Sequence, residues 1–96
     1  MTFQIIFRNS KLEYLKKQDT KIISILGFVL PDLNELSGLL RKLELLAKRS
    51  KIKEIWIPFQ LSSDICLVLE GLSYKPCILG VHETLQTELR GFKKIL

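Results

Sequence analysis

Apolar residues recur at helical spacing in the middle of this 96-residue chain, and this pattern is the clearest structural signal in the sequence. Between positions 36 and 47 they follow the i, i+3, i+4, i+7 rule, with charged side chains on the opposite face, which is typical of an amphipathic helix. We therefore predict a helix from about Leu33 to Arg49. Asp32 followed by Glu35 resembles a capping box at its start. The apolar face consists of Leu36, Leu39, Leu40, Leu43, Leu46 and Ala47.

Runs rich in β-branched and aromatic residues predict strands on both sides of this helix. The run 21–30 is almost continuously apolar, which is typical of a strand buried on both faces. Gly27 within it indicates a bulge or a close backbone approach. The polar segment 11–20 fits either a second strand of a hairpin or one helical turn. Pro58 removes one ladder donor from its strand, so we expect an open ladder there. The predicted strands cover residues 2–8, 21–30, 52–59, 75–81 and 89–96.

A second, shorter helix is predicted after the polar residues 62–64, which offer an N-cap. Ile65, Cys66, Leu69 and Leu72 share one of its faces. The element order is then β-(β)-β-α-β-α-β-β. This order predicts an α/β (α+β) fold in a single domain, residues 1–96, with a mixed sheet and two helices packed on it. We expect a parallel crossover around the long helix and antiparallel pairs at both ends of the chain.

Composition narrows the class of protein. The chain is 47% hydrophobic and 26% charged, which excludes intrinsic disorder. It has no apolar run long enough to span a membrane, and its first residues do not read as a signal peptide. Two cysteines are too few for a disulfide scaffold, so we expect a cytoplasmic protein with reduced thiols. The net charge of +5 fits a dispersed protein, with nucleic acid or another anionic partner as the alternative.

The histidine and the two cysteines form no recognisable catalytic or metal-binding motif. His82 is the only histidine, and we expect it in a polar loop after a strand. The spacing of Cys66, Cys77 and His82 matches no zinc motif, so no metal site is predicted. We expect both cysteines to act as small buried hydrophobic residues. Trp56 points to the opposite face of its strand from Ile55 and Ile57. It is expected in the core or on the wall of a ligand groove.

The segments 39–59 and 69–76 carry a resemblance to a known family. Ala47-Lys48-Arg49-Ser50-Lys51-Ile52 is similar to a turn that ends the long helix of the GNAT superfamily of N-acetyltransferases, with Lys51 in place of glycine. Leu72-Ser73-Tyr74 is similar to the family's Leu-Gly-Phe turn, with Ser73 in place of glycine. The chain from about residue 21 onwards thus resembles the C-terminal half of that fold. The resemblance implies that two neighbouring strands splay apart and that the cofactor arm enters between them.

The resemblance also implies where acetyl-CoA would bind and shows that this site is degenerate. The family holds the cofactor's pyrophosphate on backbone N–H groups of a Gln/Arg-x-x-Gly-x-Gly/Ala loop. Here the two glycine positions fall on Asn34 and Leu36, and the stretch 31–36 has no glycine, arginine or glutamine. Asp32 and Glu35 would occupy these N–H groups and repel phosphate.

Two further positions of the implied site also differ from the family. The family's asparagine after the strand corresponds to Ser62, and its tyrosine general acid corresponds to Leu69, which cannot transfer a proton. By family position, the cofactor-binding residues would be Val29, Leu30, Leu36, Ser37 and Ser62.

Three functions remain open at this point. The first is an acetyltransferase-like binding or interaction domain that is not an enzyme and needs no cofactor. Its partner would be a second copy or another protein, because the missing N-terminal elements would leave apolar sheet surface uncovered. The second is an N-acetyltransferase that binds acetyl-CoA or CoA through an atypical loop. The third is a small basic protein associated with nucleic acid, for which no sequence motif is present.

Overall fold

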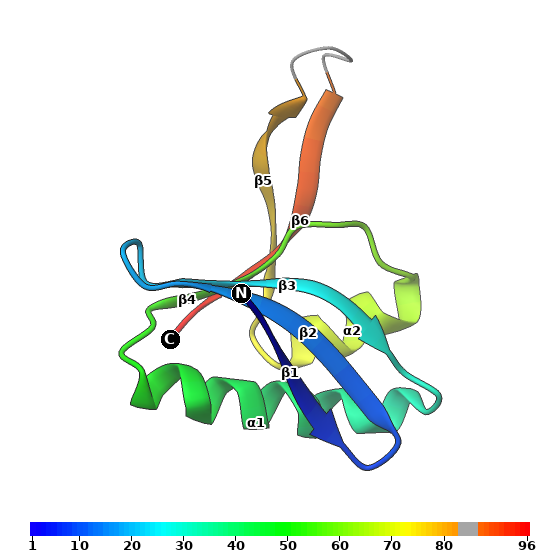
Figure 1. Ribbon diagram of the computed structural model, residues 1–96. Helices are drawn as coiled ribbons and strands as arrows, with labels where there is room; N and C mark the ends of the chain where they lie inside the picture. Colours follow the sequence, from blue (N-terminus) through cyan, green and yellow to red (C-terminus); the bar gives the residue numbers. More distant parts are fainter. Residues whose placement is uncertain (83–86) are drawn as a thin grey trace.

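A computed structural model describes residues 1–82 and 87–96 and gives an α+β fold, as the sequence predicts (Figure 1). The segment left open in the sequence, 11–20, forms most of a strand and not a helical turn. A short 3-10 turn, Leu33–Glu35, leads into the long helix. The strands and helices are β1 (Thr2–Phe7), β2 (Ser10–Lys17), β3 (Ile22–Val29), α1 (Leu36–Arg49), β4 (Glu54–Ile57), α2 (Ser63–Gly71), β5 (Lys75–His82) and β6 (Thr87–Ile95).

The six strands form one mixed sheet in the order β1-β2-β3-β4-β6-β5. β3 and β4 are parallel and are joined through α1, whereas the other neighbouring pairs are antiparallel. The predicted crossover and the antiparallel pairs at both ends of the chain are therefore confirmed. β1 and β5 form the two edges of the sheet.

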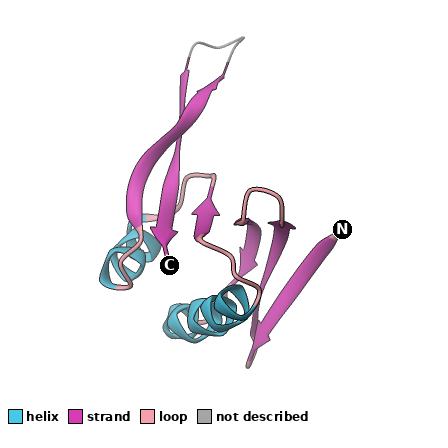
Figure 2. Cartoon of the chain, turned by 90° about the vertical axis from the view of Figure 1, so that its left-hand side faces the viewer, coloured by secondary structure: helices cyan, strands magenta, loops and turns pink. Residues whose placement is uncertain are grey.

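Both helices pack on the same side of the sheet, as Figure 2 shows. The apolar face predicted for α1 is buried, except that Leu46 is partly exposed. The expectation that β3 is buried on both faces is wrong, because no helix of the described residues covers the opposite side of the sheet. Leu26 is 46% and Val29 50% exposed. The fully buried core includes Leu12, Ile23, Ile25, Leu36, Leu39, Leu40, Leu43, Ala47, Ile55, Ile57 and Leu69.

A register shift interrupts the pairing of β2 with β3 next to the glycine of that strand. Glu13 pairs with Gly27 and Tyr14 with Ile25, so Leu26 is the extra residue of a bulge. A side chain built on Gly27 would meet no atom within 4 Å. Of the two alternatives read from the sequence, the bulge is therefore correct and the close approach is not.

β4 is shorter than predicted, because the residues on either side of it have other roles. The Ile52 N–H donates to Ala47 O at 2.8 Å and so terminates α1. Pro58 directly follows the last strand residue, Ile57, and does not interrupt the ladder from within. Trp56 is half-buried and alternates with the buried Ile55 and Ile57, so it faces away from the helices.

Both helices end in the same left-handed turn, formed without glycine. Lys51 has φ 60° and Ser73 has φ 71°, and these are the two positions where the resembling family carries glycine. The 2.8 Å bond from Ile52 N to Ala47 O closes the first turn, and a 2.9 Å bond from Tyr74 N to Leu69 O closes the second. Both are Schellman motifs, in which a non-glycine residue adopts an unfavourable backbone conformation.

The C-terminal hairpin of β5 and β6 projects away from the helices (Figure 1). His82, expected in a loop, belongs to β5, and Thr87 belongs to β6. The last strand accordingly begins two residues earlier than predicted. The rest of the predicted loop, residues 83–86, lies outside the described residues.

Candidate functional site

The parallel strands β3 and β4 pair over only three residues before they diverge. Ile22, Ile23 and Ser24 lie opposite Glu54, Ile55 and Trp56, and no pairing follows along the remaining length of β3. Beyond this point, the half-buried rings of Phe28 and Phe59 meet edge to face, with their centroids 6.2 Å apart. Two aromatic side chains are therefore in contact where the pairing of β3 with β4 has ended.

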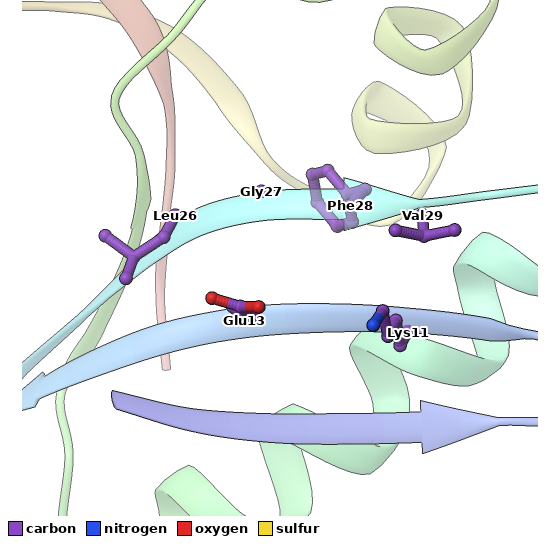
Figure 3. Close-up of a pocket in the computed structure, with 6 residues that line it drawn as sticks. All are labelled: Lys11, Glu13, Leu26, Gly27, Phe28 and Val29. Atoms are coloured by element: carbon purple, nitrogen blue, oxygen red, sulfur yellow. The ribbon is translucent and has the colours of Figure 1, made fainter. Parts of the chain in front are cut away.

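The sheet face away from the helices is called the outer face below. A shallow hollow of about 230 Å³ lies on this face, beside the bulge (Figure 3). It takes two charged side chains from β2 and an apolar wall from β3. This volume is below the range of about 300–1,000 Å³ that is usual for small-molecule sites. Its lining residues are Lys11, Glu13, Leu26, Gly27, Phe28 and Val29.

The backbone N–H groups before α1 are already engaged. The Asp32 carboxylate accepts a 3.0 Å hydrogen bond from Asn34 N, as expected for an N-cap. Glu35 N donates to Asp32 O at 3.0 Å, and Leu36 N donates to Leu33 O. Three consecutive amides that a phosphate would need are therefore bonded within the protein.

Glu35 does not complete the predicted capping box. Its side chain points into the protein, where it is only 6% exposed, and its Oε1 accepts a 2.6 Å hydrogen bond from Ser10 Oγ. Ser10 is itself buried at the start of β2. Glu35 immediately precedes α1, so a negative charge here repels a second anion at this helix end.

Phe7 covers the first turn of α1 from the side of β1. A Cβ atom added to Gly38 would lie 2.5 Å from Phe7 Cζ and 2.7 Å from Phe7 Cδ1. A larger residue at this position would therefore force the Phe7 ring to shift. This contact is a further obstacle to a ligand at the start of α1.

The five residues predicted to bind a cofactor do not form one accessible site. Val29 is exposed and lines the hollow on the outer face, and Leu30 is half-buried. Leu36 is fully buried in the core, and Ser37 is half-buried beside it. Ser62 is the exposed N-cap of α2, but its side chain makes no capping hydrogen bond. Leu69, at the position of the family's general acid, is also fully buried.

Sequence reasoning missed a polar cluster that ties α1 to the C-terminal strands. The Tyr74 hydroxyl donates to Glu44 Oε2 at 3.0 Å, and Lys94 Nζ lies 2.9 Å from Glu44 Oε1. Burial, and then the Glu44 carboxylate, raise the pKa of the Tyr74 phenol well above its ordinary value. The one feature of the sequence that could have indicated this cluster is the position of Glu44, next to Leu43 and at the border of the apolar helix face.

Neither cysteine is fully buried, contrary to the expectation from sequence. Both thiols are half-buried and free. Cys66 Sγ donates to Leu61 O at 3.7 Å and borders an apolar hollow of about 240 Å³ between α2 and the C-terminal hairpin. The described residues contain no group of three side chains able to hold a metal ion. Within the same part of the chain, no helix has the length and apolarity to cross a membrane.

No family model, curated protein or solved structure matches this chain.

Proposed function

We propose that this chain is an acetyltransferase-like binding or interaction domain that does not bind acetyl-CoA and is not an enzyme. The resemblance implies a buried strand, a long helix, a diverging strand, a short helix and a closing hairpin, and the observed order of elements supports it. The left-handed turns at Lys51 and Ser73 support it as well, because they occupy the family's glycine positions.

The main support for the proposal that acetyl-CoA does not bind is the buried Glu35 carboxylate, which accepts a hydrogen bond from Ser10 Oγ at 2.6 Å. A pyrophosphate at the start of α1 would face this carboxylate and the Asp32 cap, and would find the nearby amides already bonded. Repulsion and lost hydrogen bonds both oppose phosphate binding. Catalysis is opposed separately, since the buried Leu69 offers no proton to a departing thiolate.

A thermal-shift titration with CoA and acetyl-CoA tests this proposal. A ligand present at about 1,000 times its Kd adds about 4 kcal/mol to the free energy of unfolding. For a domain of this size, that raises Tm by more than about 10 °C. We expect no shift with either ligand. A large shift would instead favour the transferase that uses the backbone of Val29 and Leu30 and the N–H groups near Leu36 and Ser37.

The partner is proposed to bind the outer face of the sheet, and a second copy of this chain is the simplest candidate. Ile6, Leu26, Val29 and Ile95 expose large apolar side chains on this face, and burying such surface drives association. We further propose a cytoplasmic location, in keeping with the two free thiols.

Sedimentation equilibrium provides the test of this interface. We expect the wild-type chain to dimerise and Val29→Lys to weaken the dimer. Leu67→Lys is the matched control, because Leu67 is exposed on α2, away from the outer face. A strict monomer at high concentration, or equal effects of the two substitutions, contradicts the proposed interface.

A further inference from the structure

Positive charge is concentrated at one end of the molecule, which we call the basic end. It consists of residues 16–21, 48–53, 75 and 93–94, which contain ten of the 15 lysine and arginine residues. The acidic residues of this region are Asp19, Glu54 and the adjacent Glu44. Apart from these three carboxylates, the rest of the chain has five basic and seven acidic residues. The modest net charge thus conceals a strong separation of charge.

The topology brings these separate segments together. β3 and β4 are parallel and begin at this end, whereas their antiparallel neighbours β2 and β6 finish there. Lys53 N donates to Lys21 O at 2.9 Å, and Gln18 Nε2 donates to Ser50 O at 3.2 Å. In Figure 1 the β2–β3 turn, the end of α1 and the C terminus lie on the left side of the molecule.

Three of the ten cations are engaged by neighbouring groups. Lys94 pairs with Glu44, and Lys93 lies 3.8 Å from Glu54 and over the Trp56 ring. Lys16 lies over the Phe3 ring. The other seven are exposed, and no ion pair with them occurs among the described residues. The partial negative charge of about 0.5 at the end of α1 offsets little of this excess.

Two of the exposed lysines occupy a backbone conformation that favours glycine. Lys21 has φ 59° and Lys51 has φ 60°, and they precede the parallel strands β3 and β4. A non-glycine residue in this region carries a conformational cost. Both lysines thus lie immediately before the two parallel strands and are exposed to solvent.

The width of the basic end suits an extended polyanion. It spans β2, β3, β4, β6 and β5, and four strand spacings of about 4.8 Å give about 19 Å. Double-stranded DNA carries one phosphate charge per about 1.7 Å of its axis. Several phosphates of one duplex segment thus match the row of lysines.

We propose that the basic end binds the phosphate backbone of double-stranded nucleic acid without reading its sequence. A duplex is favoured over a single strand because the aromatic rings near this end, Phe3, Trp56 and Tyr74, each already have a lysine over them. Single-strand binding depends on free aromatic faces that stack with bases. This inference is independent of the proposal about the cofactor site.

Fluorescence anisotropy with a labelled duplex of about 20 base pairs tests the inference, with salt varied from about 50 to 200 mM. The test variant is Lys21→Gln/Lys53→Gln. The matched control, Arg8→Gln/Arg41→Gln, removes the same charge from exposed positions outside the basic end. Circular dichroism shows whether each variant folds.

We expect the wild type to bind the duplex with a steep salt dependence. The test variant should reduce the slope of log K against log salt by about 1.8, since each lost phosphate contact removes about 0.9. The control variant should retain the wild-type slope. The inference is overturned by absence of binding at about 50 mM salt, by equal losses in both variants, by tighter binding to the single strand, or by equal binding to poly-glutamate.

Discussion

Replacement of Gly38 by alanine should destabilise the protein, although alanine is the better helix former. In α1 the substitution would gain up to about 1 kcal/mol from helix propensity. The new Cβ would lie 2.5–2.7 Å from atoms of the Phe7 ring, so the ring must move by about 1 Å to reach ordinary contact distance. Overpacking of this kind costs about 1–3 kcal/mol. We expect a net loss of about 1 kcal/mol in the free energy of unfolding.

Gly71 provides a matched control in the other helix. A Cβ added there would meet no atom within 4 Å, so Gly71→Ala should stabilise the protein by up to about 1 kcal/mol. Urea denaturation monitored by circular dichroism measures both effects. Unchanged m values would show that the substitutions change the free energy of unfolding and not the surface exposed on unfolding. In a Phe7→Leu background, the loss caused by Gly38→Ala should shrink or change sign. If Gly38→Ala stabilises the protein as much as Gly71→Ala does, Phe7 does not cover the start of α1.

Three further predictions use other contacts. Ser10→Ala should lower the free energy of unfolding by about 1.5–3 kcal/mol in urea titrations, because the buried Glu35 loses its hydrogen-bond donor; an unchanged midpoint would contradict the pairing. Lys51→Gly and Ser73→Gly should each raise the free energy of unfolding by about 0.5–1 kcal/mol, and with it the thermal midpoint, since glycine adopts the left-handed turn freely. Tyr74 has a raised pKa, so the folded protein retains a proton that the unfolded chain loses above about pH 10. Stability should therefore fall with a slope of up to about 1.4 kcal/mol per pH unit above that pH, and Tyr74→Phe should remove this part of the slope.

The sequence was sufficient for the elements whose burial pattern is local. The leucines of α1 identify the helix because its buried face repeats every three or four residues. The strand at 22–29 was identified by composition, but its exposed outer face was not predicted. That error arose because an apolar run shows neither which faces of the sheet receive helices nor whether one is left open.

Contacts between distant segments could not be predicted in the same way. Glu35 resembled a helix cap, and only the tertiary fold places Ser10 next to it. The Phe7 ring over Gly38 and the Tyr74 hydroxyl on Glu44 likewise join segments that are about 30 residues apart in sequence. The separation of charge was hidden for the same reason, because the lysines become neighbours only when β2, β4 and β6 meet at one end of the sheet.

The most direct test of the closed start of α1 is an amide NMR titration of the wild-type protein with CoA. The readout is the set of backbone N–H signals from Asn34 to Gly38, which any bound pyrophosphate at this position would perturb. We predict that these signals do not shift at about 1,000 times a micromolar Kd, the excess at which a genuine site is saturated. Saturable shifts confined to these amides would contradict the claim that Asp32, Glu35 and Phe7 close this site.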